Sequence, residues 1–389
     1  MIRQIRRFTR PVPVLGNGAL AIAVYAEPTQ AGMRVRSAAE QGFEGVACVD
    51  DAARAAVLYT TLWRRHRLPW ARDAAVGLLT FVRAMQTADG TFANFILDWD
   101  GRKNLTTTTS KPGDGPWVAR AMHALACGVS ALGDANCAES FEKGLPWLDR
   151  ATPYLDVRAV CVLASVEYWR ATSADQVAAR GLAWAKEIAD AARNNVLPNE
   201  VGSTQTHLWG HLQEVALADA GMAFDRPDLV EAARRSTEAV LIPPLEQHFP
   251  GARVLPFDVS CVVRGLDAMA AATGESRYER KASLARAWFD GRNTASAPVY
   301  DRAAGLVFDG IDDGRVSENS GAEANIEGAL GLLDSLPLHL YEPSLSSAPA
   351  RAPQPERGGP QWSHPYDRTW QRQPSPSSSP AARANASGR

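Results

Sequence analysis

The sequence has few cysteines and no paired spacing between them. Only five occur in 389 residues, and none forms a Cys-x-x-Cys pair. Disulfide frameworks and zinc ribbons both depend on such spacing, so neither is indicated. We expect the cysteines to be small buried side chains in a reducing compartment.

Runs of one charge and long apolar runs are also scarce. The chain carries 41 Lys and Arg against 43 Asp and Glu, a formal net charge of -2, without a long run of basic residues. This balance argues against nucleic acid as the main partner. No segment is apolar and uncharged over enough residues to cross a bilayer. A soluble globular protein without a membrane span is therefore expected.

Several chemical motifs are missing as well. The sequence contains no Gly-rich phosphate loop, no Gly-x-Ser-x-Gly nucleophile elbow and no EF-hand loop. A nucleotide-dependent role has no support, and no cofactor is predicted.

The N-terminal residues leave two locations open. Several arginines precede a weakly apolar run over 14–26, and 24–26 fits the small-residue rule for signal cleavage. Prolines and glycines interrupt that run. A cytoplasmic location is therefore the main expectation, and export through a weak N-terminal signal is the alternative.

Ala- and Leu-rich segments at helical spacing dominate from residue 51 to about 337, whereas alternating strand patterns are scarce. Short connections, such as the one that contains Pro69, predict antiparallel helical hairpins. The expected helices span 51–66, 70–86, 115–132, 137–148, 156–171, 175–194, 206–222, 227–241, 258–273, 276–289 and 320–336.

Unequal connections favour a closed ring of hairpins over an open solenoid, which would show a fixed period. The long loops follow residues 86, 194, 241 and 289 and fall on every second connection. This placement puts them at one end of a two-layer ring, which would be the active face. An extended segment is expected over 1–41, and a disordered Pro/Ser/Arg-rich tail over 341–389.

Two adjacent carboxylates, Asp50 and Asp51, stand where a Gly-containing extended segment gives way to an Ala-rich helix. Aspartate is a preferred N-cap, because its oxygen accepts hydrogen bonds from the free N–H groups of the first turn. One of the pair can cap while the other is available for chemistry. The helix dipole and the neighbouring charge are expected to push their pKa values apart. The structural alternative is that both only cap and face solvent.

The long loops add acidic and aromatic residues. Asp114 precedes a helix that begins with proline, and Glu323 lies in the first turn of the last helix; capping and the helix dipole alone also explain both placements. Trp99 sits between two aspartates in a polar loop, where packing gives little reason for a tryptophan. Trp117 and Trp209 lie in expected helices, where core packing is the simpler interpretation.

The segment 43–55, Phe-Glu-Gly-Val-Ala-Cys-Val-Asp-Asp-Ala-Ala-Arg-Ala, resembles the G-Y-C-x-D-D-N-A-R-A segment of a six-hairpin toroid domain often fused behind bacterial glycosyltransferases. Ala52 replaces the usual Asn, and Asp114 stands alone where that family has Glu-Asp before an Arg-Ala helix. Ala324 replaces a Ser. Further pieces are similar to that family's N-F-M-x-Y-D, W-F-L-G-R-N, L-Y-D, C-x-D-G-L and N-x-G-A-E-S segments, namely 93–101, 288–293, 300–301, 308–310 and 319–323.

The resemblance implies an all-α (α/α)6 toroid over 42–340 and an association with carbohydrate. Helical toroids of this kind carry many glycoside hydrolases, whose catalytic carboxylates lie at the open end of the inner helices. Glycosidic cleavage needs one protonated carboxylic acid for the leaving oxygen and one ionised carboxylate for water or the sugar carbon. We predict that Asp51 and Asp114 form this pair.

Polar and aromatic residues of the same face are expected to bind an oligosaccharide or polysaccharide substrate. Flat apolar rings suit pyranose C–H groups, and polar groups suit hydroxyls or an acidic substituent. The predicted substrate-binding residues are Asp50, Arg54, Asn94, Trp99, Trp117, Trp209, His211, Glu214, Asp258, Tyr300 and Glu323.

The segment 207–214 supports an alternative hypothesis for the function. His207 and His211 lie four apart on one face of an expected helix, with Glu214 close behind. This spacing can hold a metal, but no third firm ligand is evident, so no metal is predicted. Histidines also suit the proton transfers of a sugar epimerase or isomerase. A non-catalytic glycan-binding module is the third possibility.

Overall fold

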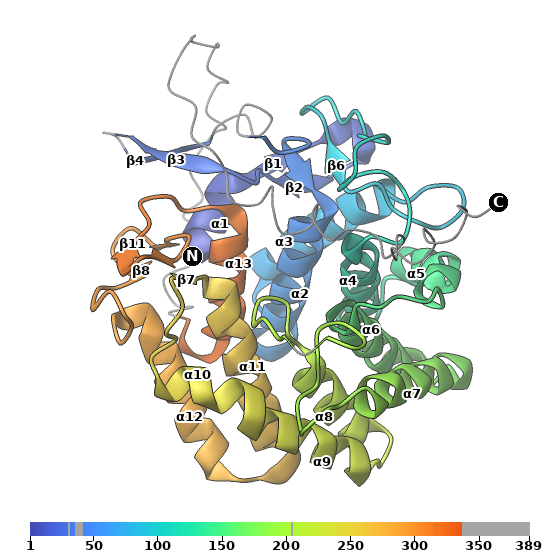
Figure 1. Ribbon diagram of the computed structural model, residues 1–389. Helices are drawn as coiled ribbons and strands as arrows, with labels where there is room; N and C mark the ends of the chain where they lie inside the picture. The colour runs from blue at the N-terminus through green and yellow to red at the C-terminus, as the bar shows by residue number, and fades with distance from the viewer. Residues whose placement is uncertain (30–31, 36–41, 204, 337–389) are drawn as a thin grey trace, which may run out of the picture. The chain divides into compact units, whose positions relative to one another are not determined.

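The computed structural model describes residues 1–29, 32–35, 42–203 and 205–336. Helices dominate these residues (Figure 1). None of the described helices is long and apolar enough to cross a membrane. The tail that we predicted to be disordered, 341–389, lies outside the described residues.

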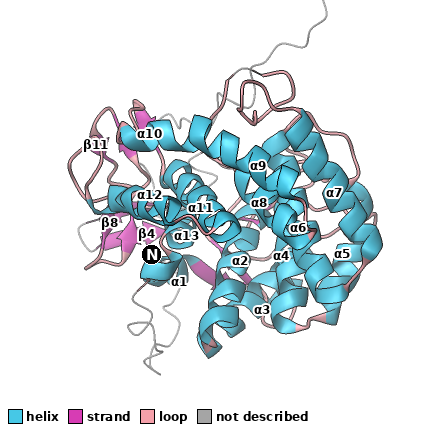
Figure 2. Ribbon diagram, turned by 90° about the horizontal axis from the view of Figure 1, so that it is seen from below, coloured by secondary structure: helices cyan, strands magenta, loops and turns pink. Residues whose placement is uncertain are grey.

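Within this part of the chain, six inner helices form a closed ring. Each contacts the next, and α13 returns to α2 (Figure 2). An outer helix packs beside each inner one, which makes an (α/α)6 toroid as predicted. The inner helices are α2 (Val49–His66), α4 (Pro116–Leu132), α6 (Leu155–Thr172), α8 (Gln213–Ala223), α11 (Pro256–Thr273) and α13 (Ala322–Gly331). The outer helices are α3 (Pro69–Ala84), α5 (Ala135–Leu148), α7 (Asp175–Asp190), α9 (Pro227–Ser236), α12 (Ser276–Arg286) and α1 (Ile2–Phe8).

Burial explains which helices lie inside. In α6 almost every residue from Leu155 to Tyr168 is buried, because an inner helix is covered by two neighbours and an outer partner. In α7 only one face is buried. Helix α6 is therefore buried nearly all round, whereas α7 is amphipathic.

The N-terminal segment corrects one expectation, since residues 2–8 form helix α1 rather than extended chain. Ile2, Ile5 and Phe8 recur every third residue and are buried, and α1 packs against α13. Each such side chain contributes about 1.5–3 kcal/mol of transfer free energy. The helix supplies the outer layer of the sixth hairpin, so this segment is part of the ring.

Most expected helices are present with ends shifted by a few residues. The exception is 206–222, because the observed α8 begins only at Gln213 and 206–212 is a loop. After α9 the chain continues through a π-helical turn, Thr237–Leu241, into the short α10 (Ile242–Glu246). Short 3₁₀ turns occur at Pro13–Leu15, Ala287–Asp290 and Leu333–Ser335.

Small antiparallel strand pairs lie in the loops that lead into the inner helices. In the pair that matters most for the site, Cys48 of β5 opposes Phe95 of β6. The other pairs are β1 with β2, β3 with β4, β8 with β9, and β10 with both β7 and β11. The strands are β1 (Thr9–Pro11), β2 (Leu20–Ile22), β3 (Ala26–Thr29), β4 (Gly32–Val35), β5 (Ala47–Cys48), β6 (Phe95–Ile96), β7 (Arg253–Val254), β8 (Tyr300–Asp301), β9 (Leu306–Val307), β10 (Ile311–Asp312) and β11 (Arg315–Val316).

Candidate active site

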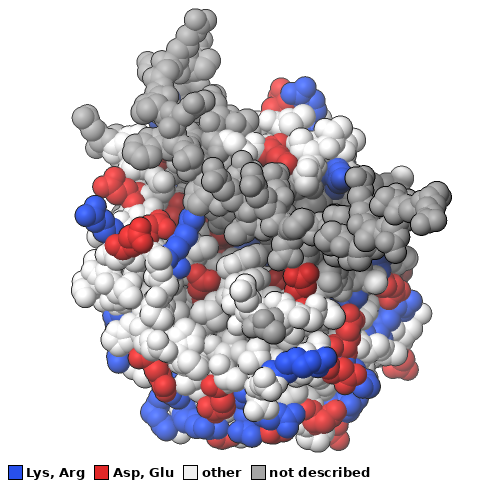
Figure 3. Space-filling model, viewed as in Figure 1, with Lys and Arg blue, Asp and Glu red and all other residues white. Residues whose placement is uncertain are grey.

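The first turns of the inner helices meet at one end of the ring, and all of them except that of α4 carry carboxyl groups. Arg54 of α2 pairs with Glu323 of α13, and Arg120 of α4 pairs with Asp50 of α2. In the view of Figure 3, acidic side chains are visible in the middle of the described surface. The first-turn acids are Asp50 and Asp51 in α2, Asp156 in α6, Glu214 in α8, Asp258 in α11 and Glu323 in α13.

The start of α2 is fixed by its preceding strand. Cys48 is the N-cap, and its sulfur accepts a hydrogen bond from the Asp51 backbone N–H at 3.4 Å. The Asp50 N–H donates to Asn94 Oδ1 at 3.2 Å. Because other groups satisfy these orphan donors, neither aspartate caps the helix. Both carboxyl groups are left for side-chain contacts.

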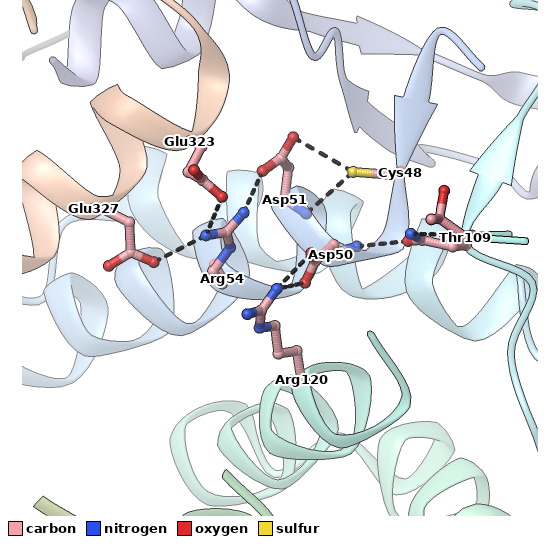
Figure 4. A network of polar contacts seen from close by, with 9 residues as sticks. Cys48, Asp50, Asp51, Arg54, Thr109, Arg120, Glu323 and Glu327 are labelled. Atoms are coloured by element: carbon pink, nitrogen blue, oxygen red, sulfur yellow. Dashed lines mark hydrogen bonds and ion pairs between the residues drawn. The ribbon is translucent and has the colours of Figure 1, made fainter. Parts of the chain in front are cut away.

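Arg54 is the centre of a buried ion network (Figure 4). Its guanidinium donates to Asp51 at 2.7 Å, to Glu323 at 3.0 Å and to Glu327 at 3.2 Å. The Glu323 side chain is 29% exposed, whereas those of Arg54 and Glu327 are 8% and 1% exposed. The network therefore joins α2 to α13 and reaches accessible space at Glu323.

The two adjacent aspartates have opposite pKa shifts, as the sequence predicts. Burial opposes the charge of Asp50, but Arg120 and Arg54 outweigh it and lower the pKa of that carboxyl. Burial raises the pKa of Asp51 to about 6, against the charge of Arg54. Asp50 is thus ionised at neutral pH, whereas Asp51 titrates at about pH 6.

Two further carboxyl groups titrate in the same range. Asp258 accepts a hydrogen bond from the Leu255 N–H at 2.7 Å, and burial raises its pKa to about 6. Asp309, in the loop before α13, accepts a hydrogen bond from the Gly321 N–H at 2.5 Å, and burial raises its pKa to about 6 as well. The charge of Glu323 raises both pKa values further, which indicates that these acids are near one another.

Phe257 forms an apolar platform among these charges. The guanidinium carbon of Arg54 lies 5.2 Å from the centre of its ring, and that of Arg120 lies 5.9 Å away. Gly210, with a φ of +73°, approaches from the opposite loop, and a Cβ there would lie 3.8 Å from Asp156 and 3.9 Å from Phe257. This close approach, in a conformation that suits glycine, brings the loop before α8 onto the site. Burial raises the pKa of Asp156 to about 6.

The structure corrects the prediction for the two histidines, which lie in this loop and not on one helical face. His211 is 1% exposed, and its Nε2 lies 3.0 Å from Glu214. His207 is half-buried, with its ring stacked on Trp209 at 3.8 Å between centroids. No group of three His, Cys, Asp or Glu residues is placed to hold a metal among the described residues.

Other predicted residues are engaged within the protein. Both ends of the Asn94 amide are bonded, to the Asp50 N–H and to the Thr109 carbonyl. Trp117 is buried and donates to the Phe92 carbonyl at 2.8 Å, as the core interpretation predicts.

Three other predicted residues differ in their burial. Trp99 packs against the core from its loop, and Tyr300 is buried in β8 beside Arg302. Asp114 is exposed, one residue before the N-cap Gly115.

Sequence reasoning missed several residues of the site. Arg120 lies one turn into α4, and the Arg-Ala helix noted in the family resemblance was its only signal. Asp156 follows a helix start in the same way as Asp51, so its position could have revealed it. Glu327 is one turn beyond Glu323, and the two share a helix face.

No protein-family model matches the chain, and no curated protein gives a significant sequence match. Solved structures are similar to it. A sugar epimerase from a ruminal bacterium superposes with a TM-score of 0.66 at 12% identity, over 86% of this chain and 95% of that one. The cellobiose 2-epimerase of Bacillus thermoamylovorans B4167 gives 0.66 at 8% identity, over 86% and 96%. The GH76 alpha-mannanase BT2949 of Bacteroides thetaiotaomicron gives 0.57 at 11%, over 75% and 86%. The chain therefore has the same toroid fold of six helical hairpins as these structures.

Proposed function

We propose that this protein is a carbohydrate-active enzyme that hydrolyses a glycosidic bond with paired carboxyl groups. The observation that supports this best is the opposite pKa shift of carboxyl groups at one end of the ring. Asp50 is held ionised by Arg120, while Asp258 has a pKa of about 6. Carboxyl groups whose environments separate their pKa values suit the acid and base roles of glycoside cleavage.

In this proposal Asp258 donates the proton to the leaving oxygen. It is half-buried, so a substrate oxygen can reach it. Asp50, whose side chain is 22% exposed, activates water or stabilises the positive charge that develops on the sugar. Both groups come from first turns of the inner ring, which holds them in fixed positions.

The pair predicted from the sequence, Asp51 and Asp114, stays a prediction. Asp51 is held between Arg54 at 2.7 Å and the Cys48 thiol at 3.4 Å, and its side chain is only 7% exposed, against 22% for Asp50. We therefore propose that Asp51 positions Arg54. Asp114, which is exposed, is the alternative proton donor at the rim.

The test is a screen of the purified protein against oligosaccharides, with products separated by chromatography. For a substrate that is cleaved, Asp50→Asn and Asp258→Asn should each lower kcat/KM by about 10²- to 10⁴-fold. Circular dichroism and the melting temperature check that each variant is folded. If Asp51→Asn and Asp114→Asn abolish hydrolysis while Asp258→Asn stays active, the catalytic pair is Asp51 and Asp114, as predicted from the sequence. Binding without turnover would indicate a glycan-binding module.

The pH dependence tests the proton donor separately. Because Asp258 must be protonated and its pKa is about 6, kcat/KM should fall as pH rises through about 6. A rate that stays constant from pH 5 to 8 would contradict this role.

A sugar epimerase or isomerase is the second candidate, and His207 favours it. Burial lowers the pKa of this histidine to about 4, so the ring is neutral and able to accept a proton. Among similar structures are epimerases and one described as a D-mannose isomerase. Epimerisation predicts deuterium incorporation at the sugar carbon in D₂O, lost in His207→Ala or His211→Ala but kept in Asp258→Asn. Hydrolysis predicts the reverse pattern.

A further inference from the structure

The accessible side chains of the site are mostly hydrogen-bond acceptors. Carboxyl groups with exposed or half-buried surface come from four segments of the ring and its loops. They are Asp50, Asp258, Asp309 and Glu323. An ionised carboxylate accepts hydrogen bonds and donates none. At neutral pH Asp50 is ionised, and Asp258 and Asp309, with pKa values of about 6, are mostly ionised as well.

The arginines of the site are already committed to these acids. Arg54 is bonded to three carboxyl groups, and Arg120 donates to both oxygens of Asp50 (Figure 4). Arg253 pairs with Asp312 at 3.4 Å, and the charges of Arg54 and Arg264 only partly offset the burial that raises the pKa of Glu327. Carboxyl groups thus outnumber guanidinium groups at this end of the ring, and Arg54, Arg120 and Arg253 each have a carboxylate partner in the protein.

His207 adds a further acceptor. Its Nδ1 lies 2.9 Å from the backbone oxygen of Trp209. A carbonyl oxygen only accepts, so Nδ1 carries the hydrogen and Nε2 of the neutral ring has a lone pair. In the described part of the chain no protein group is bonded to Nε2. Trp209 precedes Gly210, which brings this acceptor to the same end of the ring as Asp156.

From this donor and acceptor balance we infer that the site takes a sugar unit with a free amino group, in preference to a neutral sugar, and rejects uronic acids. The inference rests on the proposed carbohydrate function and concerns the same site. A sugar ammonium brings three donors and a positive charge to a group of carboxylates. A uronate would instead lie beside an excess of carboxylates and would compete with them for a guanidinium, which is unfavourable.

Binding of matched monosaccharides to the full chain tests the inference. Three series are used, each with the amino sugar, the neutral hexose and the uronate of one configuration: glucose, mannose and galactose. In at least one series, calorimetry or ligand-observed NMR should show the amino sugar bound about tenfold tighter than the hexose, and the uronate weaker than both. Added NaCl should reduce this preference, because salt screens charges.

Variants locate the effect. Glu323→Gln should reduce the amino-sugar preference severalfold, whereas Glu139→Gln, an exposed acid on outer helix α5, should leave it unchanged. Uronate binding as tight as that of the hexose would overturn the inference, and so would the absence of binding in all three series. If an oligosaccharide is cleaved yet amine and acid are accepted equally, the inference fails and the hydrolase proposal stands. If no oligosaccharide is cleaved but the amino-sugar preference is seen, the hydrolase proposal fails and the inference stands.

Discussion

The first turns of α2 and α8 both bury a carboxyl group, but with different partners. In α2, Asp51 is bonded to the permanently charged Arg54 at 2.7 Å. In α8, Glu214 has His211 at 3.0 Å and the Ser236 hydroxyl at 2.5 Å. The α2 side therefore depends on one cation that balances several acids, whereas the α8 side depends on hydrogen bonds from separate elements. The two regions should respond differently to substitution and to pH.

Removal of the cation should have the largest effect. Arg54→Met leaves three carboxyl groups without their shared partner, and breaking a buried ion pair costs about 3–5 kcal/mol in the free energy of unfolding. Urea denaturation at pH 7 measures this loss. Arg170→Met is the matched control, because Arg170 pairs with Asp219 at 2.7 Å but is 40% exposed. The control should change stability by at most about 1 kcal/mol, and equal losses would contradict the comparison.

A smaller loss is expected at α8. His211→Asn removes a buried hydrogen bond to Glu214, while the Ser236 bond stays, so the free energy of unfolding should fall by about 1–3 kcal/mol. His66→Asn changes an exposed histidine and should have little effect. A loss at His211 larger than that at Arg54 would reverse the order of the two regions.

The smallest effect concerns α11, whose first-turn acid Asp258 forms no ion pair among the described residues. Its pKa is about 6 in the folded state and 3.8 ordinarily, so the folded state binds more protons between pH 4 and 6. Stability from this group is present at low pH and is lost as pH rises through that window. Asp258→Asn keeps an oxygen for the Leu255 N–H but stays neutral. It should raise the melting temperature at pH 7.5, equivalent to about 1 kcal/mol after screening, and by clearly less at pH 4.5.

The control for this prediction is an aspartate whose pKa is shifted in the opposite direction. Asp228 is exposed, and its hydrogen bond to Arg226 lowers its pKa. Asp228→Asn should therefore not stabilise the protein at pH 7.5. Stabilisation by both substitutions would show that the effect is general and not due to burial of Asp258.

The contrast between α2 and α8 also marks what could be predicted from the sequence. The change from extended, Gly-containing chain to an Ala-rich helix is local. The start of α2 could therefore be inferred, and so could the separation of the pKa values of its two aspartates. The start of α8 could not. The segment 206–212 has an apolar pattern compatible with a helix, but the bond from the His207 N–H to Asn199 Oδ1 at 3.0 Å holds it as a loop.

Pairings across the ring were beyond the reach of local patterns. Arg120 and Asp50 are 70 residues apart, and their contact depends on the relative heights of two helices. Helix α1 was missed for the same reason, because its seven residues carry too short a pattern and its burial depends on α13. The hairpins themselves were predictable, since each is set by neighbouring segments and a short turn.

Helix α1 covers α13, so the last hairpin is assembled from opposite ends of the described chain. During synthesis, α1 leaves the ribosome long before α13. Its apolar side chains therefore stay unburied until the other five hairpins have been made. The ring cannot close during that time, because α13 is the helix that joins α11 to α2. Late closure of this kind makes slow steps and chaperone contact expected features of its biosynthesis.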